Sequence, residues 1–184
     1  MRSTYLLCSI LMSALATSLP AQNQSAPTNP RPARAGLTLT SPAFADGGVI
    51  AAQPTSPKLE WKNVLPDTAS FVLIMHDVNT SISKTGEDVL HWMVFNIPSN
   101  ARELPANLPI AAELPDGSIQ GVSRGGENGY RPFAVGGEAP HHYVFDLYAL
   151  DIKLSLGPKA TRVEVLKAMD GHVVEKGALI GRNR

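Results

Sequence analysis

The chain has 184 residues, and its 16 basic side chains balance its 16 acidic ones, so the net charge at pH 7 is zero with histidine neutral. This balance excludes binding to nucleic acid or to an anionic membrane through overall charge, and it favours a small ligand or a local protein surface as the partner. A mature chain of about 160 residues can bury one hydrophobic core but is too short for two large domains.

The N-terminal segment is typical of a secretory signal peptide. A short positive start precedes the apolar run 5–15 (YLLCSILMSAL), which is too short for a membrane-spanning helix, since that needs roughly 20 apolar residues. Small residues follow, and we expect cleavage after Ala21. Cys8 is the one cysteine of the chain, and it comes too early for a lipid-modified cysteine. The sequence therefore predicts a signal peptide over 1–21 and a periplasmic or secreted protein that lacks cysteine and a transmembrane anchor once mature.

Residues 22–36 (QNQSAPTNPRPARAG) are rich in Pro, Asn and Ala and show no apolar periodicity, which is typical of a flexible linker. The folded domain is expected to cover residues 37–184. We find no internal repeat and no second linker within it.

From residue 37 the pattern favours β-strands. Apolar residues alternate with Thr and Ser in 37–44 (LTLTSPAF), and the segment 56–61 (SPKLEW) places Leu59 and Trp61 on one face. Three runs are apolar on both faces, as expected for central strands that are covered on both sides: 70–77, 90–98 and 141–151.

The remaining segments are loops and one helix. The stretch 98–139 is rich in Gly and Pro, and a loop of this length is usually functional or contains short elements. A helix is expected over 161–171 (TRVEVLKAMDG), because Thr161 can cap its N-terminus and Gly171 can end it. Its apolar residues recur at helical spacing: Val163, Leu166 and Met169. The sequence therefore predicts one mainly β domain with a short helix near its C-terminus.

Two adjacent histidines begin the third apolar run. Because side chains alternate across a strand, His141 and His142 point to opposite faces and cannot easily chelate one metal ion, whereas His141 and Tyr143 share a face. Asp77 ends one strand and His91 begins the next, so the two lie at the same end of the sheet if these strands are antiparallel neighbours. A carboxylate can orient an imidazole there, although periodicity alone also allows a surface Asp and a satisfied core His. Strict alternation gives two further groupings: Phe71, Leu73 and Met75 with Asp77, and Met93, Phe95 and Ile97 with His91.

The motifs together resemble the phosphatidylethanolamine-binding protein (PEBP) family, and most closely its bacterial, Raf kinase inhibitor-like branch. The resemblance spans roughly residues 37–184 and rests on several motifs in the family's order: TSPKLEW, SFVLIMHDV, HWMVFNIP, GYRPF and APHHYVFDLYALD. It implies a PEBP-like Greek-key β-sandwich with one or two short helices near the C-terminus. It also implies a small pocket at one end of the sheet that accepts phosphate, acetate, cacodylate or the phosphoethanolamine head group.

The resemblance assigns the pocket residue by residue. The first Asp of the family's Asp-Pro-Asp-Ala-Pro motif corresponds to Asp77, the His of its His-Trp motif to His91, and the His and Tyr of its His-(His/Arg)-Tyr motif to His141 and Tyr143. Imidazole, phenol and backbone N–H groups supply the donors that a phosphate oxygen needs. Neither a metal ion nor a cofactor is expected, and the partner is a small anion or a phosphorylated ligand.

The rim of the pocket departs from the family pattern. Residues 77–81 read DVNTS, without the two prolines and the second acid, and 130–137 read YRPFAVGG where relatives have a Gly-Pro-Pro-type loop. Within that loop Tyr130 either packs or covers the pocket, and Arg131 either adds a cation to the pocket or points to solvent. Arg182 stands where relatives often have Tyr. These changes affect the expected ligand specificity more than the expected fold.

Three alternative functions stay open beside a non-catalytic binding module. A His–Asp pair could act as a general base, but the chain has no Gly-x-Ser-x-Gly motif, and nothing marks Ser81 or Ser123 as an activated nucleophile. An inhibitor of a protease or kinase is a second alternative, as some relatives are named. Asp77, His91 and His141 could imitate a two-His-one-carboxylate metal site, which is the third.

The remaining histidines and the oligomeric state receive simpler expectations. His76 and His172 are expected to be structural or surface groups, and His142 to contribute little to ligand binding. The family resemblance favours a homodimer and leaves a protein target open.

Overall fold

The computed structural model describes residues 34–51, 54–81, 86–133 and 140–183. The signal-peptide prediction and most of the predicted linker fall on residues 1–33, which lie outside the described residues, as do residues 134–139 of the altered loop. In the part that is described, no helix is long and apolar enough to cross a membrane.

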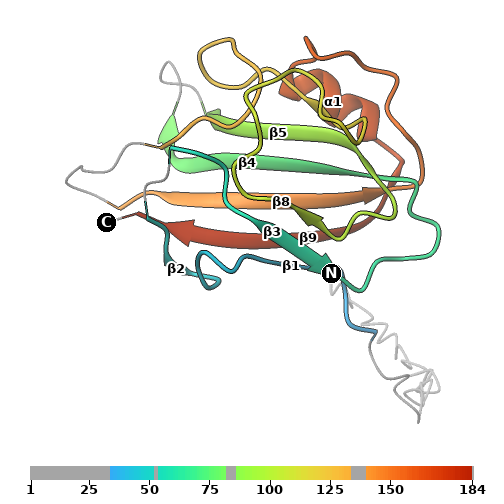
Figure 1. Cartoon of the computed structure of the whole chain (residues 1–184), viewed down its shortest axis with the longest axis horizontal. Coiled ribbons are helices and arrows are strands. Elements are labelled where there is room, and N and C mark those ends of the chain that lie inside the picture. Colours follow the sequence, from blue (N-terminus) through green and yellow to red (C-terminus); the bar gives the residue numbers. More distant parts are fainter. Residues whose placement is uncertain (1–33, 52–53, 82–85, 134–139, 184) are drawn as a thin grey trace, which may run out of the picture. The chain divides into compact units, whose positions relative to one another are not determined.

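The described chain forms two β-sheets and one helix (Figure 1). The small sheet has the order β1-β3-β6 and the large sheet the order β2-β9-β8-β4-β5-β7; all pairs are antiparallel except β2 with β9. The elements are, in chain order, β1 (Thr38–Thr40), β2 (Gly48–Val49), β3 (Leu59–Lys62), β4 (Ser70–Ser81), β5 (Asp88–Pro98), β6 (Glu103–Leu104), β7 (Ile119–Gln120), β8 (His142–Leu150), α1 (Arg162–Met169) and β9 (Val173–Arg182). The mainly β prediction is confirmed.

The large sheet is covered on both faces, which explains why its central strands are apolar without alternation. One core lies between the two sheets and includes Trp61 of β3 and Phe71 of β4, whose rings meet edge to face with centroids 5.4 Å apart. A second core lies between the opposite face and α1, where Val72 of β4 packs with Val165 and Met169 of the helix. The three central strands β4, β5 and β8 therefore each present one row of side chains to either core.

The helix begins as its sequence predicts but turns a different face to the core. The side chain of Thr161 accepts a hydrogen bond from the backbone N–H of Glu164, and the Glu164 carboxylate accepts one from the backbone N–H of Thr161, which forms a capping box. Val165 and Met169 are the buried helical residues, whereas Val163 is 69% exposed. Of the predicted apolar positions 163, 166 and 169, only Met169 lies on the buried face.

Strict alternation fails on β5, because two irregularities interrupt its pairing with β4. Met75 pairs with Trp92 but the next residue, His76, pairs with Leu90, so His91 is the extra residue of a β-bulge. A second register shift lies near Asn96, whose φ is +57°. As a consequence Met93 and Phe95 face the helix while Ile97 faces the small sheet. The predicted grouping of His91 with Met93, Phe95 and Ile97 was wrong.

Candidate functional site

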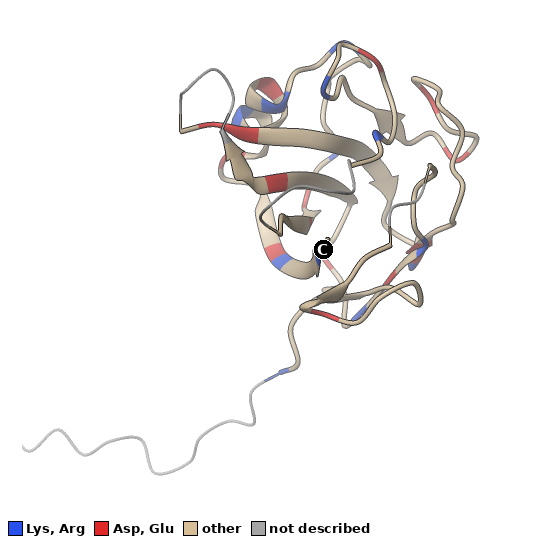
Figure 2. Cartoon of the chain, turned by 90° about the vertical axis from the view of Figure 1, so that its left-hand side faces the viewer, with Lys and Arg blue, Asp and Glu red and all other residues tan. Residues whose placement is uncertain are grey.

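A small hollow of about 90 Å³ lies at the end of the large sheet where β4 and β9 finish and β5 and β8 begin. Figure 2 views this end, with the C-terminus at its centre, and shows basic positions scattered among acidic ones rather than gathered into a tract. Seven residues line the hollow: Asp77, Thr80, His91, Arg124, His141, Tyr143 and Asn183. The structure thus brings together four residues that were predicted from the sequence: Asp77 of β4, His91 of β5, His141 just before β8 and Tyr143 of β8.

Asp77 is buried at the base of this hollow and is surrounded by donors. Its Oδ1 accepts a hydrogen bond from the backbone N–H of Asn79 at 2.9 Å, and its Oδ2 accepts one from the Thr80 hydroxyl at 2.8 Å and one from Nδ1 of His141 at 2.6 Å. Burial by itself would raise the pKa of Asp77, but these hydrogen bonds outweigh burial and hold the pKa below its ordinary value. Asp77 is therefore an anion that orients the His141 ring and closes the 77–80 turn, which has no proline.

His91 lies at the bulge and is almost completely buried, with 2% of its surface exposed. Its Nδ1–H donates to the carbonyl of Arg131 at 3.0 Å, and its ring meets that of Tyr143 edge to face, with centroids 5.4 Å apart. Burial is the main cause that lowers the pKa of His91, and the raising effects of the Arg131 carbonyl and of Asp77 do not offset it. The hollow therefore contains an imidazole whose lowered pKa favours the neutral form and whose Nδ1 is already engaged, so only Nε2 is left to titrate or bind.

Tyr143 supplies a phenol that stays protonated. Burial raises its pKa to about 12, and the negative charge of Asp77 adds to this effect. The ring stacks on Phe133, with centroids 4.2 Å apart, and the hydroxyl accepts a long hydrogen bond of 3.5 Å from Nδ2 of Asn183. Asn183 is fixed in turn, because its Oδ1 accepts a hydrogen bond from the backbone N–H of His141 at 2.6 Å. The end of β9 thereby locks the start of β8 beside the hollow.

Arg124 is the cation of this site, and it comes from the loop after β7. Its backbone N–H donates to the carbonyl of Leu90 at 3.0 Å, which fixes the loop along β5. No acidic partner for its guanidinium is found among the described residues. Its positive charge lowers the pKa of both His91 and Tyr143, although burial dominates both shifts in pKa. Arg124 is therefore available for a negatively charged ligand.

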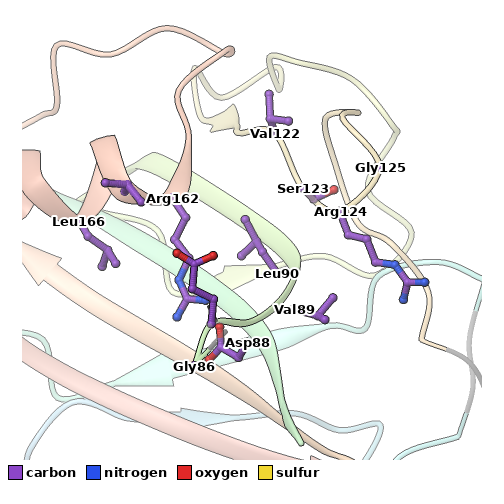
Figure 3. Close-up of a pocket in the computed structure, with 12 residues that line it drawn as sticks. Gly86, Asp88, Val89, Leu90, Val122, Ser123, Arg124, Gly125, Arg162 and Leu166 are labelled. Atoms are coloured by element: carbon purple, nitrogen blue, oxygen red, sulfur yellow. Dashed lines mark hydrogen bonds and ion pairs between the residues drawn. The ribbon is translucent and has the colours of Figure 1, made fainter. Parts of the chain in front are cut away.

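Arg124 also borders a second and larger cavity of about 680 Å³, between the start of β5, the loop 122–125 and α1 (Figure 3). Its walls are mostly aliphatic, from residues such as Leu90, Val122 and Leu166, and two of its four charged residues, Asp88 and Arg162, are paired with each other. Specific ligand sites gather several free polar groups around one point. We therefore take the small hollow, and not the larger cavity, as the candidate site.

The structure does not place the two predicted rim residues on the wall of the hollow. Tyr130 is buried against Trp92, with ring centroids 5.7 Å apart, and burial raises the pKa of its hydroxyl. Arg131 pairs its guanidinium with Glu127, and its carbonyl holds Nδ1 of His91. Neither side chain therefore lines the hollow: Tyr130 packs beside β5, and Arg131 acts through its carbonyl, which holds the His91 ring.

The other histidines lie away from the hollow. His142 is exposed on the opposite face, where its backbone N–H donates to Oδ1 of Asn79 at 2.7 Å. His172 pairs with Asp151 near the other end of β8. His76 is buried between two carboxylates on the helix side of the sheet.

Sequence reasoning missed three residues of the hollow: Thr80, Arg124 and Asn183. Thr80 follows Asp77 by three residues, a spacing typical of a local turn in which the hydroxyl bonds the carboxylate, so a signal was present. Arg124 lies in a loop and Asn183 follows the last strand, and neither residue belongs to a pattern whose spacing indicates a site. Within the described residues no group of three or more His, Cys, Asp or Glu side chains is placed to hold a metal ion.

Comparison with known proteins shows the family of the chain. The family model described as phosphatidylethanolamine-binding protein matches residues 40–184. A UPF0098 protein of Methanothermobacter thermautotrophicus is 41% identical over 155 residues, which are 80% of this chain and 99% of that protein. A protein named as the lipoprotein LppC of Mycobacterium tuberculosis is 30% identical over 161 residues, covering 84% of this chain and 75% of the relative.

Solved structures show the same fold. A PEBP homologue of Chlamydia trachomatis, CT736, is 31% identical, superposes with a TM-score of 0.72, and the match covers 81% of this chain and 97% of the homologue. Escherichia coli YbcL, described as a member of the mammalian PEBP family, is 25% identical with a TM-score of 0.73, and the match covers 82% of this chain and 99% of YbcL. The match of a family model over most of the chain, together with these relatives, shows that the chain belongs to the phosphatidylethanolamine-binding protein family.

Proposed function

We propose that this protein binds a small oxyanion, such as phosphate or the phosphorylated head group of phosphoethanolamine, in the hollow at the end of the large sheet. The observation that carries the proposal is the convergence of a guanidinium, imidazoles and a phenol on one cavity of about 90 Å³. This volume suits a tetrahedral anion and is too small for a bulky substrate.

The donors suit an anion in kind as well as in number. The guanidinium of Arg124 and the phenol of Tyr143 can each donate to an oxygen of the ligand, whereas His141 already donates its Nδ1–H to Asp77, so its Nε2 can donate only in the imidazolium form. Charge-assisted hydrogen bonds contribute on the order of 1.5–3 kcal/mol each. With one fully charged donor and the Asp77 carboxylate nearby, we expect an affinity in the micromolar to millimolar range.

Anion binding is expected to be coupled to proton uptake. Burial lowers the pKa of His91, whereas a negative charge placed beside the ring favours the imidazolium form, so the pKa of His91 rises when the ligand binds. Because the pKa of His91 rises, the protein takes up protons when the anion binds. Calorimetry in two buffers of different ionisation enthalpy would measure the number of protons.

Histidine NMR signals test the site directly. We expect phosphate at tens of millimolar or below to shift the ring signals of His91 and His141 and to leave those of His172 unchanged, because His172 pairs with Asp151 outside the hollow. Tyr143→Phe removes one donor without removing the ring and should weaken binding severalfold. An unchanged spectrum of His91 and His141 at saturating concentrations would contradict the proposal.

We further propose that the protein is exported after cleavage behind Ala21. The apolar run 5–15 supports this proposal, as does the lipoprotein name of the Mycobacterium tuberculosis relative. The intact mass of the protein from an exporting host should correspond to a chain that begins at Gln22. A mass that corresponds to acylated Cys8, or to the uncleaved chain, would contradict it.

A further inference from the structure

The three strands that form the hollow also form a charge cluster on their opposite face. On β4 this cluster contains His76, next in sequence to Asp77; on β5 it contains Asp88, and on β8 Asp146. Nδ1 of His76 contacts Oδ2 of Asp88, and Nε2 contacts Oδ2 of Asp146 at 3.1 Å. One imidazole thus bridges from β4 to both of its neighbouring strands.

Both contacts of His76 require that the ring is protonated. A carboxylate accepts hydrogen bonds, and a neutral imidazole has a single N–H, so only the imidazolium can donate to Asp88 and Asp146 at once. Burial by itself would lower the pKa of His76, but the hydrogen bonds to Asp146 and Asp88 outweigh it, and the pKa lies above its ordinary value. Geometry and electrostatics therefore agree on a charged ring.

The charges around this ring come from four further places. Arg162 at the start of α1 pairs with Asp88, as Figure 3 shows, and Lys176 of β9 pairs with Asp146 at 3.1 Å. Arg162 slightly opposes protonation of His76 by charge repulsion. Glu87, which precedes Asp88, lines the neighbouring cavity. Asp77 follows His76 on β4 and points to the opposite face of the sheet, into the hollow. When His76 is neutral, Asp88 keeps Arg162 and Asp146 keeps Lys176 as ion-pair partners. What is lost is one of the two hydrogen bonds that His76 of β4 donates to the neighbouring strands.

The cluster is connected to the hollow through the backbone. The register shift that makes His91 a bulge residue lies between Met75 and His76 of β4. Asp88 and His91 are three residues apart on β5, while Asp146 and Tyr143 are three residues apart on β8. The two contacts of His76 therefore fix the spacing of β4, β5 and β8 on the helix side of the sheet. The side chains of the same three strands meet on the other side to form the hollow.

We infer that His76 is a proton-dependent positioning residue for the anion hollow. As the imidazolium it ties β5 and β8 to β4, and so holds His91 and Tyr143 in place around the site beside Asp77. When it loses its proton, one of the two bridges loses its donor, the strands relax and the anion binds less tightly. This inference rests on the proposed function and adds to it a linkage between the anion site and a proton site on the other face.

Anion affinity as a function of pH, in matched variants, tests the inference. The wild-type protein, His76→Gln and the control His172→Gln are titrated with inorganic phosphate about one pH unit below and one above the pKa of His76 measured by NMR. Because the residues of the hollow are the same in all three proteins, the ratio of two affinities isolates the effect of His76. We expect His76→Gln to bind about fivefold more weakly than wild type at the lower pH and equally at the higher pH, and His172→Gln to match wild type at both.

A second measurement uses the wild-type protein and does not depend on a variant that folds. If phosphate binds the protein more tightly when His76 is protonated than when it is neutral, then by reciprocity phosphate must raise the pKa of His76. The rise equals the base-ten logarithm of the ratio of these two affinities. His142 serves as the control for long-range electrostatics, since it follows His141 directly and its ring contacts the amide oxygen of Asn79 and not a carboxylate. Its ring signals should respond less to phosphate than those of His76.

The outcomes separate the two proposals. An affinity ratio that is the same at both pH values, or ring signals of His76 that respond to phosphate no more than those of His142, would show that His76 only stabilises the fold and would overturn the inference while the proposed function stands. If the wild-type protein binds no phosphate at either pH, the proposed function fails and the inference fails with it.

Discussion

The two faces of β4, β5 and β8 carry histidines in opposite states for a physical reason that can be read from their neighbours. On the hollow side, the Nδ1–H of His91 meets a backbone carbonyl and the ring is buried, so its pKa is lowered. On the helix side, both ring nitrogens of His76 meet carboxylates, so its pKa is raised. Burial disfavours the charged form at both sites, and the partners decide which effect wins.

The comparison also separates a structural cluster from a binding site. Around His76 every charge has an opposite partner: Asp88 with Arg162, and Asp146 with Lys176. In the hollow the guanidinium of Arg124 has no acidic partner among the described residues, and the phenol of Tyr143 donates to none of them. Saturated polar groups hold strands together, whereas donors left open in a cavity are suited to a ligand.

The largest effect is expected from breaking the saturated cluster. Asp146→Ala leaves His76 and Lys176 as two neighbouring cations with one partner lost, and we expect it to lower the free energy of unfolding by about 3 kcal/mol. Denaturant unfolding at neutral pH measures this change. Asp151→Ala breaks the exposed pair with His172 and should cost less than about 0.5 kcal/mol. Equal losses in the two variants would remove the distinction between a buried cluster and a surface pair.

The hollow should respond in affinity and not in stability. Arg124→Gln removes its exposed cation, and we expect phosphate affinity to fall about tenfold, or about 1.4 kcal/mol, with an unchanged midpoint of denaturation. Arg131→Gln is the matched control, since the charge of Arg131 is paired with Glu127 and its carbonyl is retained. Weaker binding in Arg131→Gln than in Arg124→Gln would show that the altered loop, and not the loop after β7, supplies the cation.

The smallest effect is a difference in slope with pH. A raised pKa means that His76 contributes stability that is fully present below the unfolded-state pKa of about 6.5 and is lost as pH rises through the higher folded-state value. His91 has a lowered pKa, so it destabilises the fold as pH falls below about 6.5. The loss of unfolding free energy should therefore be greater at pH 5.5 than at pH 8.5 for His76→Gln, and the reverse for His91→Gln. Parallel pH profiles for the two variants would contradict the assigned protonation states.

Much of the fold could be predicted because the central strands are long and their composition is distinctive. The last strand was not predicted, and its glycines explain why. Gly177 and Gly181 occupy buried positions of β9 where large apolar residues would mark a strand. A Cβ on Gly177 would lie 2.6 Å from the carbonyl oxygen of Leu37, and one on Gly181 would lie 3.0 Å from the ring of Phe44. Other segments pack there so closely that no side chain fits, and a local pattern does not contain that information.

The site was predicted in part, through the family resemblance and through strand periodicity. Periodicity placed His141 and Tyr143 on one face correctly, because β8 is regular between them and its pairing with β4 has no shift. It correctly placed His91 at the same end of the sheet as Asp77 but wrongly grouped it with Met93 and Phe95, because a bulge is an extra residue that depends on the partner strand. Arg124 and Asn183 reach the hollow from a loop and from the chain end, so only the folded structure reveals them.

The sequence by itself determined the elements whose cause is local: apolar runs long enough for central strands, a capping box at Thr161, and the two-residue period that puts His141 beside Tyr143. The tertiary structure alone decided which way His91 turns and which histidine is charged. The physical reason is that both properties depend on atoms from other strands, on the register against β4 in one case and on the carboxylates of β5 and β8 in the other.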